Sequence, residues 1–166
     1  KRNQIIFFIL IFLLLGCSNR GNDIQRSDMY FEKALKYYND EKYSRSKDQF
    51  QRIIDNYSGT EVAVDALYYL AFCEYELKEF QDAKQSFKIY ARYSQDIIKV
   101  QLTRFMVCKC MLELTLDHPH DQTETTNALD EFQIFIEDYP GSKFNEEAME
   151  YIHSLRNKLS RKQYEI

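Results

Sequence analysis

The residues best suited to chemistry are two histidines and their acidic neighbours in the stretch DHPHD. His118 and His120 are separated by a proline and flanked by Asp117 and Asp121. Imidazole and carboxylate groups are common zinc ligands and common proton carriers in catalysis. The third histidine, His153, lies far along the sequence. A solvated polar loop explains this cluster more simply, so we expect no metal site, no catalytic site and no cofactor.

Familiar catalytic motifs do not occur elsewhere in the sequence. It contains no H-E-x-x-H pair, no glycine-rich phosphate loop and no G-x-S-x-G turn. The many acidic residues alternate with lysines as they do on solvated helix faces. The sequence therefore predicts that the protein is not an enzyme.

An apolar run near the start of the chain ends in a cysteine. Lys1 and Arg2 precede eleven apolar residues at 5–15. A helix that crosses a bilayer core of ~30 Å takes ~20 residues, so this run is too short to span. A short basic segment followed by a short apolar one is typical of a secretory signal.

The residues that follow this run suggest a lipid anchor. The stretch LLGC at 14–17 resembles the bacterial lipobox, in which the cysteine sulfur receives a diacylglycerol before the signal is cut away. An ordinary signal peptide is the alternative, but the small-residue cleavage site that it uses is absent. We predict a lipoprotein signal peptide at 1–16, lipidation at Cys17 and a lipidated tether at 17–26. Serine after the cysteine favours sorting to the outer membrane.

The other three cysteines are predicted to be buried free thiols. Cys73, Cys108 and Cys110 lie in apolar patterns with helical spacing, and their number is odd. Unpaired cysteine often behaves as a small apolar core residue. The single residue between Cys108 and Cys110 is also shorter than the spacing of zinc sites.

The composition favours an all-α protein that binds neither nucleic acid nor charged lipid headgroups. Gly and Pro number only 4 and 2, while strong helix formers are common. The formal net charge is −4, and loss of the two N-terminal basic residues makes it more negative. An acidic surface repels phosphate backbones and anionic lipids.

Internal repeats identify the architecture. FQRIIDNYSGTEVAVDA at 50–66 recurs as FQIFIEDYPGSKFNEEA at 132–148, and a weaker copy begins at Phe87. Repeats of a few tens of residues are typical of stacked helix pairs. In the tetratricopeptide pattern, small residues let paired helices approach and a phenylalanine fills the space between them. We assign these positions to three units: Ala34, Ser46 and Phe50; Ala71, Ala83 and Phe87; Met106, Ala128 and Phe132.

The sequence thus predicts an all-α, tetratricopeptide-like α-solenoid of about seven antiparallel helices, in a repeat domain at 27–166. The third unit has an insertion, which we place in a polar loop at 115–125. Thr60, Asp96 and Ser142 are candidate helix caps. The expected helices lie near 27–40, 43–57, 61–78, 80–94, 97–115, 124–139 and 143–164.

Aromatic residues on the first helix of each unit suggest a binding groove. Such helices line the concave face of a tetratricopeptide solenoid, and an apolar groove suits an extended or helical segment. For any single residue, a place in the core is about as well supported as a place in the groove. The predicted partner-binding residues are Phe31, Leu35, Tyr38, Tyr68, Phe72, Tyr75, Thr103, Val107 and Met111.

The lipobox, the three units and the C-terminal third together resemble one family. DQT at 121–123, ALDEFQIFIEDYP at 128–140 and LRNKLSRKQYE at 155–165 resemble the BamD (ComL or YfiO) family of outer-membrane assembly lipoproteins. Members usually continue for about two more repeats, so we expect C-terminal truncation. The third-unit loop also looks shorter than in the family.

The resemblance implies a non-enzymatic scaffold at the periplasmic face of the outer membrane, held by its lipid anchor. Family members belong to the β-barrel assembly machinery. Their partners are a BamA-like barrel assembly protein and unfolded outer-membrane proteins, and their N-terminal repeats are implicated in substrate recognition. The alternative is a generic periplasmic tetratricopeptide adaptor of another cell-envelope complex. A longer coiled-coil N-terminus or large insertions would favour that adaptor, and the sequence has neither.

Overall fold

The computed structural model describes the backbone of residues 18–117 and 122–163, and side chains within 26–116 and 122–160. Over these ranges the chain is all-α, without a strand, which confirms the predicted class. The described helices are α2 (Ser18–Asn39), α3 (Tyr43–Asn56), α4 (Glu61–Glu76), α5 (Phe80–Tyr93), α6 (Ile97–Asp117), α7 (Gln122–Asp138) and α8 (Asn145–Gln163).

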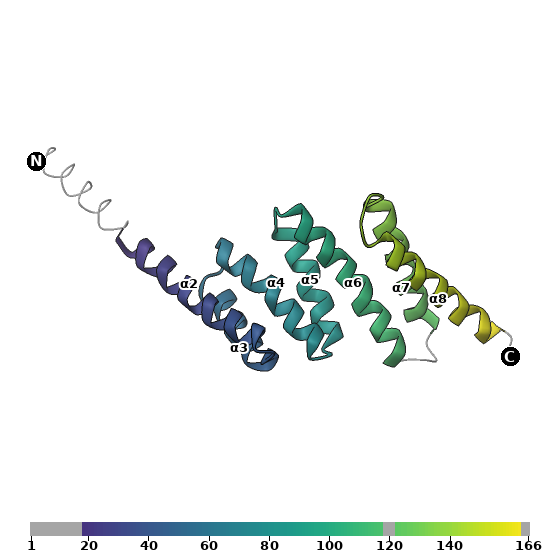
Figure 1. Ribbon diagram of the computed structural model, residues 1–166, viewed down its shortest axis with the longest axis horizontal. Helices are drawn as coiled ribbons and strands as arrows, with labels where there is room; N and C mark the ends of the chain where they lie inside the picture. Colours follow the sequence, from purple (N-terminus) through teal and green to yellow (C-terminus); the bar gives the residue numbers. More distant parts are fainter. Residues whose placement is uncertain (1–17, 118–121, 164–166) are drawn as a thin grey trace, which may run out of the picture.

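The helices stack side by side in chain order into an elongated solenoid (Figure 1). Successive helices run antiparallel, with α2–α3, α4–α5 and α6–α7 as pairs and α8 at the C-terminal end. The starts of α2, α4, α6 and α8 therefore lie along one long edge, the upper edge in Figure 1. The connections from α2 to α3 and from α4 to α5 lie along the opposite edge.

Small residues allow the paired helices to cross closely. All nine positions assigned to the small residues and the phenylalanines of the tetratricopeptide pattern are buried, and eight of them are fully so. Phe50 belongs to an apolar cluster between α2, α3 and α4, Phe87 to a second between α4, α5 and α6, and Phe132 to a third between α6, α7 and α8. The predicted repeat register is therefore confirmed at the level of the core.

The turn inside each of the first two pairs has the same backbone conformation. Glu41 and Lys78 have φ of 58° and 62°, the left-handed region that residues with a side chain seldom adopt. Each donates its backbone N–H to a tyrosine carbonyl three residues earlier, at 2.9 Å, in Tyr38 and Tyr75. Glu41 and Lys78 are separated by the same number of residues as Phe50 and Phe87. The turns therefore repeat with the same period as the buried phenylalanines.

Two of the three predicted caps are confirmed. The Thr60 hydroxyl accepts from the N–H of Ala63 at 3.3 Å, and Asp96 Oδ1 accepts from the N–H groups of Ile98 and Lys99 at 3.1 and 3.0 Å. Both satisfy helix N–H groups that otherwise have no partner. Ser142 instead stabilises the turn before α8, which begins at Asn145.

Two segments differ from the expected boundaries. α2 begins at Ser18, so 18–26, which we expected to be a tether, is helical. Helix extension from an existing turn adds one hydrogen bond per residue, which favours this continuation. The predicted loop at 115–125 is also mostly helical, since α6 ends at Asp117 and α7 begins at Gln122. Cys17, His118 and His120 lie outside the described residues.

Candidate binding site

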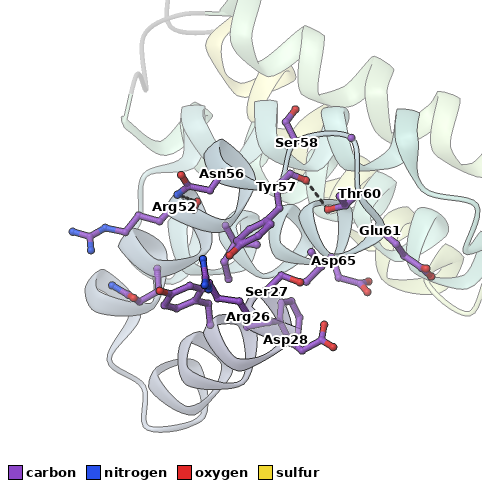
Figure 2. Close-up of a pocket in the computed structure, with 16 residues that line it drawn as sticks. Arg26, Ser27, Asp28, Arg52, Asn56, Tyr57, Ser58, Thr60, Glu61 and Asp65 are labelled. Atoms are coloured by element: carbon purple, nitrogen blue, oxygen red, sulfur yellow. Dashed lines mark hydrogen bonds between the residues drawn. The ribbon is translucent and has the colours of Figure 1, made fainter. Parts of the chain in front are cut away.

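A hollow of about 1170 Å³ opens at the N-terminal end of the solenoid, between α2, the end of α3 and the start of α4 (Figure 2). Phe31, Ile53 and Val62 contribute apolar surface from three different helices, and they belong to the core cluster around Phe50. The hollow is therefore continuous with the core rather than a separate surface feature.

The turn between α3 and α4 forms one wall of the hollow. The Thr60 hydroxyl donates to the carbonyl of Tyr57 at 2.5 Å, and both residues line the hollow (Figure 2). Gly59 has φ of 78°, which a side chain would strain, although space for a Cβ is open. These interactions fix the shape of the wall.

Charged side chains of both signs surround the apolar surface. Arg26 and Asp28 extend from α2 and Arg52 from α3, while Glu61 and Asp65 extend from α4 (Figure 2). Asp65 also pairs with Lys99 of α6 at 3.3 Å. Because the charges nearly balance, the hollow suits an apolar ligand segment with mixed or few charges better than a strongly charged ligand.

Next to the hollow, the predicted aromatic residues Phe31, Tyr38, Tyr68, Phe72 and Tyr75 form what we call the aromatic stripe. All five are partly buried, so each combines an exposed part with a part that packs inward. Burial raises the pKa of Tyr38 and Tyr68, and it raises that of Tyr75 to about 12. The stripe therefore offers uncharged rings with neutral hydroxyl groups at physiological pH.

Tyr69, which the sequence analysis did not single out, connects the stripe. Its ring lies 5.7 Å from that of Phe31, 5.3 Å from Tyr38 and 5.2 Å from Tyr68. It also stacks on Phe50 at 5.4 Å with an interplanar angle of 14°. Helical spacing could have identified Tyr69 from the sequence, because this residue shares a face of α4 with the buried Ala66 and Cys73.

The stripe also supports the core of the second unit. Tyr68 and Phe72 are 4.9 Å apart, and they contact the buried Tyr90 and Phe87 at 5.2 and 4.9 Å. The Lys99 ammonium lies 5.3 Å from the centre of the Tyr68 ring. Replacing these rings would therefore disturb both the surface and the packing.

The remaining groove predictions have mixed outcomes. Val107 and Thr103 are fully buried, so the prediction that they line the groove is wrong. Their helix, α6, packs against both α5 and α7, and this turns positions 103 and 107 inward. Met111 is partly buried against two core clusters, and Leu35 is partly buried on α2. Within the stripe, the ring of Tyr75 contacts Phe80, at 5.4 Å, which is not one of the other four stripe residues.

The thiols are poor candidates for chemistry. Cys73, Cys108 and Cys110 are free and buried, as predicted. Burial raises the pKa of Cys73 to about 11 and that of Cys110 to about 12, and it also raises the pKa of Cys108. Since the thiolate is the reactive form, these side chains are inert at neutral pH.

Neither a metal cluster nor a membrane-spanning helix is found in the part of the chain that the structure describes. Within it, no three His, Cys, Asp or Glu side chains are placed to hold a metal ion. None of the described helices combines the length and apolar character needed to cross a bilayer. What this part of the chain offers is a helical surface with a hollow at its N-terminal end and an aromatic stripe.

Comparison with known proteins assigns the chain to a family. Comparison with curated proteins gives no match. The family model YfiO, described as outer membrane lipoprotein, matches residues 22–166, which include nearly all of α2 and every later helix. Such a match over most of the chain shows the family. The helical solenoid of this chain is also the architecture that the sequence repeats predict. The chain therefore belongs to the YfiO family of outer membrane lipoproteins.

Proposed function

We propose that this chain is a non-enzymatic scaffold of the machinery that assembles β-barrels in the outer membrane. In this role it binds segments of unfolded outer-membrane proteins at the hollow and along the aromatic stripe. The observation that carries the proposal is the continuity of these two surfaces, because Phe31 belongs to the stripe and also lines the hollow, and Tyr69 contacts both Phe31 and Tyr38.

The chemistry of the two surfaces matches such clients. Strands of outer-membrane barrels alternate apolar and polar residues and carry aromatic residues near both membrane interfaces. An aromatic side chain of an extended segment fits the apolar surface of Phe31, Ile53 and Val62, while its polar neighbours meet the mixed charges of the rim. Ordering an extended client costs entropy, so we expect weak to moderate affinity. Balanced rim charges also predict little dependence on salt.

The proposed position in the cell follows from the N-terminal residues. Cys17, adjacent to the first residue of α2, carries the lipid that holds the repeat domain at the periplasmic face of the outer membrane. The family match supports an outer-membrane lipoprotein, and the lipobox-like LLGC at 14–17 indicates Cys17 as the lipidated residue.

The proposed protein partner is a BamA-like barrel assembly protein, as the resemblance implies. The C-terminal helices are the more suitable contact surface, because the hollow and the whole stripe belong to α2, α3 and α4. Ile134 of α7 and Met149 of α8 are both more than two-fifths exposed, and apolar side chains of this kind are common at protein interfaces.

Client binding is tested by filling the hollow without touching the core. Ser58 lines the hollow and is exposed, so Ser58→Trp places a large ring there. Ser154 of α8 is also exposed, and Ser154→Trp adds the same ring far from the hollow. We would titrate a labelled C-terminal peptide of an outer-membrane barrel protein against the full lipidated chain and both variants.

The proposal expects weaker peptide binding by Ser58→Trp and unchanged binding by Ser154→Trp, with equal helicity and melting temperature in all three proteins. Equal affinities for the three folded proteins would overturn it.

A further inference from the structure

The turn between α5 and α6 exposes apolar side chains that the rest of the described chain leaves uncovered. Tyr93, Ile97 and Ile98 are 64%, 79% and 80% exposed, the highest values among the large apolar side chains that the structure describes. We call these three residues the apolar tip. An isolated exposed isoleucine is ordinary, but three such residues within six positions form a patch that marks an interaction site.

The tip is held rigidly by the hydrogen bonds of the turn. The Ser94 hydroxyl donates to the Tyr90 hydroxyl at 3.0 Å and accepts from the N–H of Asp96 at 3.1 Å. Asp96 in turn caps α6 through Ile98 and Lys99. The apolar side chains at 93, 97 and 98 therefore project from a fixed backbone and do not fold back onto the helices.

The comparable turns do not share this feature. In the α3–α4 turn Tyr57 is partly buried against the core cluster around Phe50. In the α7–α8 turn Tyr139 and Phe144 are partly buried against the cluster of α6, α7 and α8. Only the α5–α6 turn, among the three described turns on this edge, keeps its large apolar residues outside.

The position of the tip indicates its partner. The α5–α6 turn and the first residue of α2, Ser18, lie along the same long edge of the solenoid (Figure 1). Cys17 precedes Ser18 directly, and consecutive Cα atoms are ~3.8 Å apart. A lipid on Cys17 would bring the N-terminal end of this edge to the membrane, and the tip would reach the same surface if the long axis of the solenoid lay along it.

We propose that the apolar tip inserts into the lipid surface to which Cys17 anchors the chain, so that the solenoid touches the membrane at two points. Isoleucine side chains enter the acyl region, and tyrosine is suited to the headgroup level because its ring is apolar and its hydroxyl polar. Around the tip, the positive charges of Arg92 and Lys99 are balanced by Asp96 and Asp65, both of which pair with Lys99. The contact therefore depends on apolar burial more than on lipid charge. The inference rests on the proposed lipid anchor.

Two contact points would fix the orientation of the hollow. The α3–α4 turn, which walls the hollow, lies on the same edge as the tip (Figure 1). The hollow would then open close to the membrane surface, where strands of a client protein must arrive. If the lipid on Cys17 were the single contact, the solenoid could rotate about it and the hollow would have no fixed orientation relative to the membrane.

Depth-dependent fluorescence quenching tests the proposal. The chain contains no tryptophan, so an introduced one reports alone. We would place it at the tip with Ile98→Trp and at the opposite edge with Leu116→Trp, because Leu116 is 63% exposed near the end of α6. Both full, lipidated variants are reconstituted into phosphatidylethanolamine–phosphatidylglycerol vesicles with or without brominated acyl chains. Flotation of the vesicles and circular dichroism confirm attachment and folding.

The proposal expects blue-shifted emission from Ile98→Trp that falls as the brominated fraction rises, and red-shifted, unquenched emission from Leu116→Trp. Unquenched emission from both variants on floating vesicles would overturn the inference and leave the anchor intact. That is also the result expected if the tip docks on a protein instead. Absence of lipid on Cys17 together with loss of flotation would overturn both the anchor and the inference.

Discussion

Ser46 and Ala34 meet where α3 crosses α2, and the Ser46 hydroxyl donates to the carbonyl oxygen of Ala34 at 3.0 Å. Both residues are fully buried. A small side chain permits the close approach of the helices, and the hydrogen bond satisfies a hydroxyl that would otherwise be costly to bury. This contact holds α2, one wall of the hollow, against α3, which forms another.

Substitution at this crossing should separate the two roles of Ser46. Ser46→Ala removes the hydrogen bond but keeps the small size, so we expect a loss of ~0.5–1.5 kcal/mol in the free energy of unfolding. Ser46→Leu overpacks the crossing and should cost ~1–3 kcal/mol or more. Urea unfolding followed by circular dichroism measures both. Equal effects of the two substitutions would contradict a tight crossing.

The phenylalanine at the centre of the second unit should dominate its stability. Phe87 is fully buried and contacts Phe72 at 4.9 Å, so Phe87→Ala should cost ~3–5 kcal/mol. Gln85 lies on the same helix but is exposed, and Gln85→Ala should change the free energy of unfolding by less than ~0.5 kcal/mol. A thermal melt of Phe87→Ala that matches that of Gln85→Ala would refute the assigned repeat register.

The sequence predicted the core better than the surface, for a physical reason. Tight helix crossings allow few residue types, so the small residue and the phenylalanine that recur at fixed spacing identify the buried positions. The residue types at exposed positions are less restricted, so the sequence identifies surface residues less reliably. Val107 was placed in the groove and Tyr69 was not singled out, because helical spacing groups residues on one face but does not say how much of that face the neighbouring helices cover. The hollow depends on how α2 diverges from α4, which no local pattern specifies.

Alkaline pH should destabilise the folded chain through its buried thiols. Burial raises the pKa of Cys73 from its ordinary value of 9.0 to about 11, although a hydrogen bond with Ser46 opposes this shift. The unfolded chain therefore ionises first, and the stability that is complete below about pH 9 falls as the pH rises toward 11. Urea unfolding in reducing buffer at several pH values measures the slope. Cys73→Ala should make the decline shallower, and an unchanged slope would exclude this thiol as its cause.

Thiol counting should report on the lipid anchor. The chain has four cysteines, and three of them are buried and free. If Cys17 carries a thioether-linked lipid, the folded mature protein has no reactive thiol and the denatured protein has three. Alkylation before and after denaturation, followed by mass spectrometry, gives both numbers. Four alkylated thiols in the mature membrane-bound protein would show that Cys17 is not modified.

Photocrosslinking in living cells tests client binding at the hollow most directly. A photoreactive amino acid replaces Tyr30, which lines the hollow and is 41% exposed, or Met149 of α8, which is 49% exposed and serves as the control. Both chains keep the signal and Cys17, and equal amounts in the outer-membrane fraction establish that they are compared in the same place. The account predicts that the probe at position 30 captures newly exported outer-membrane β-barrel proteins and that the probe at position 149 captures none of them apart from the BamA-like partner proposed to contact α7 and α8. Absence of these proteins from the position-30 crosslinks, in cells that are actively making them, would contradict the account.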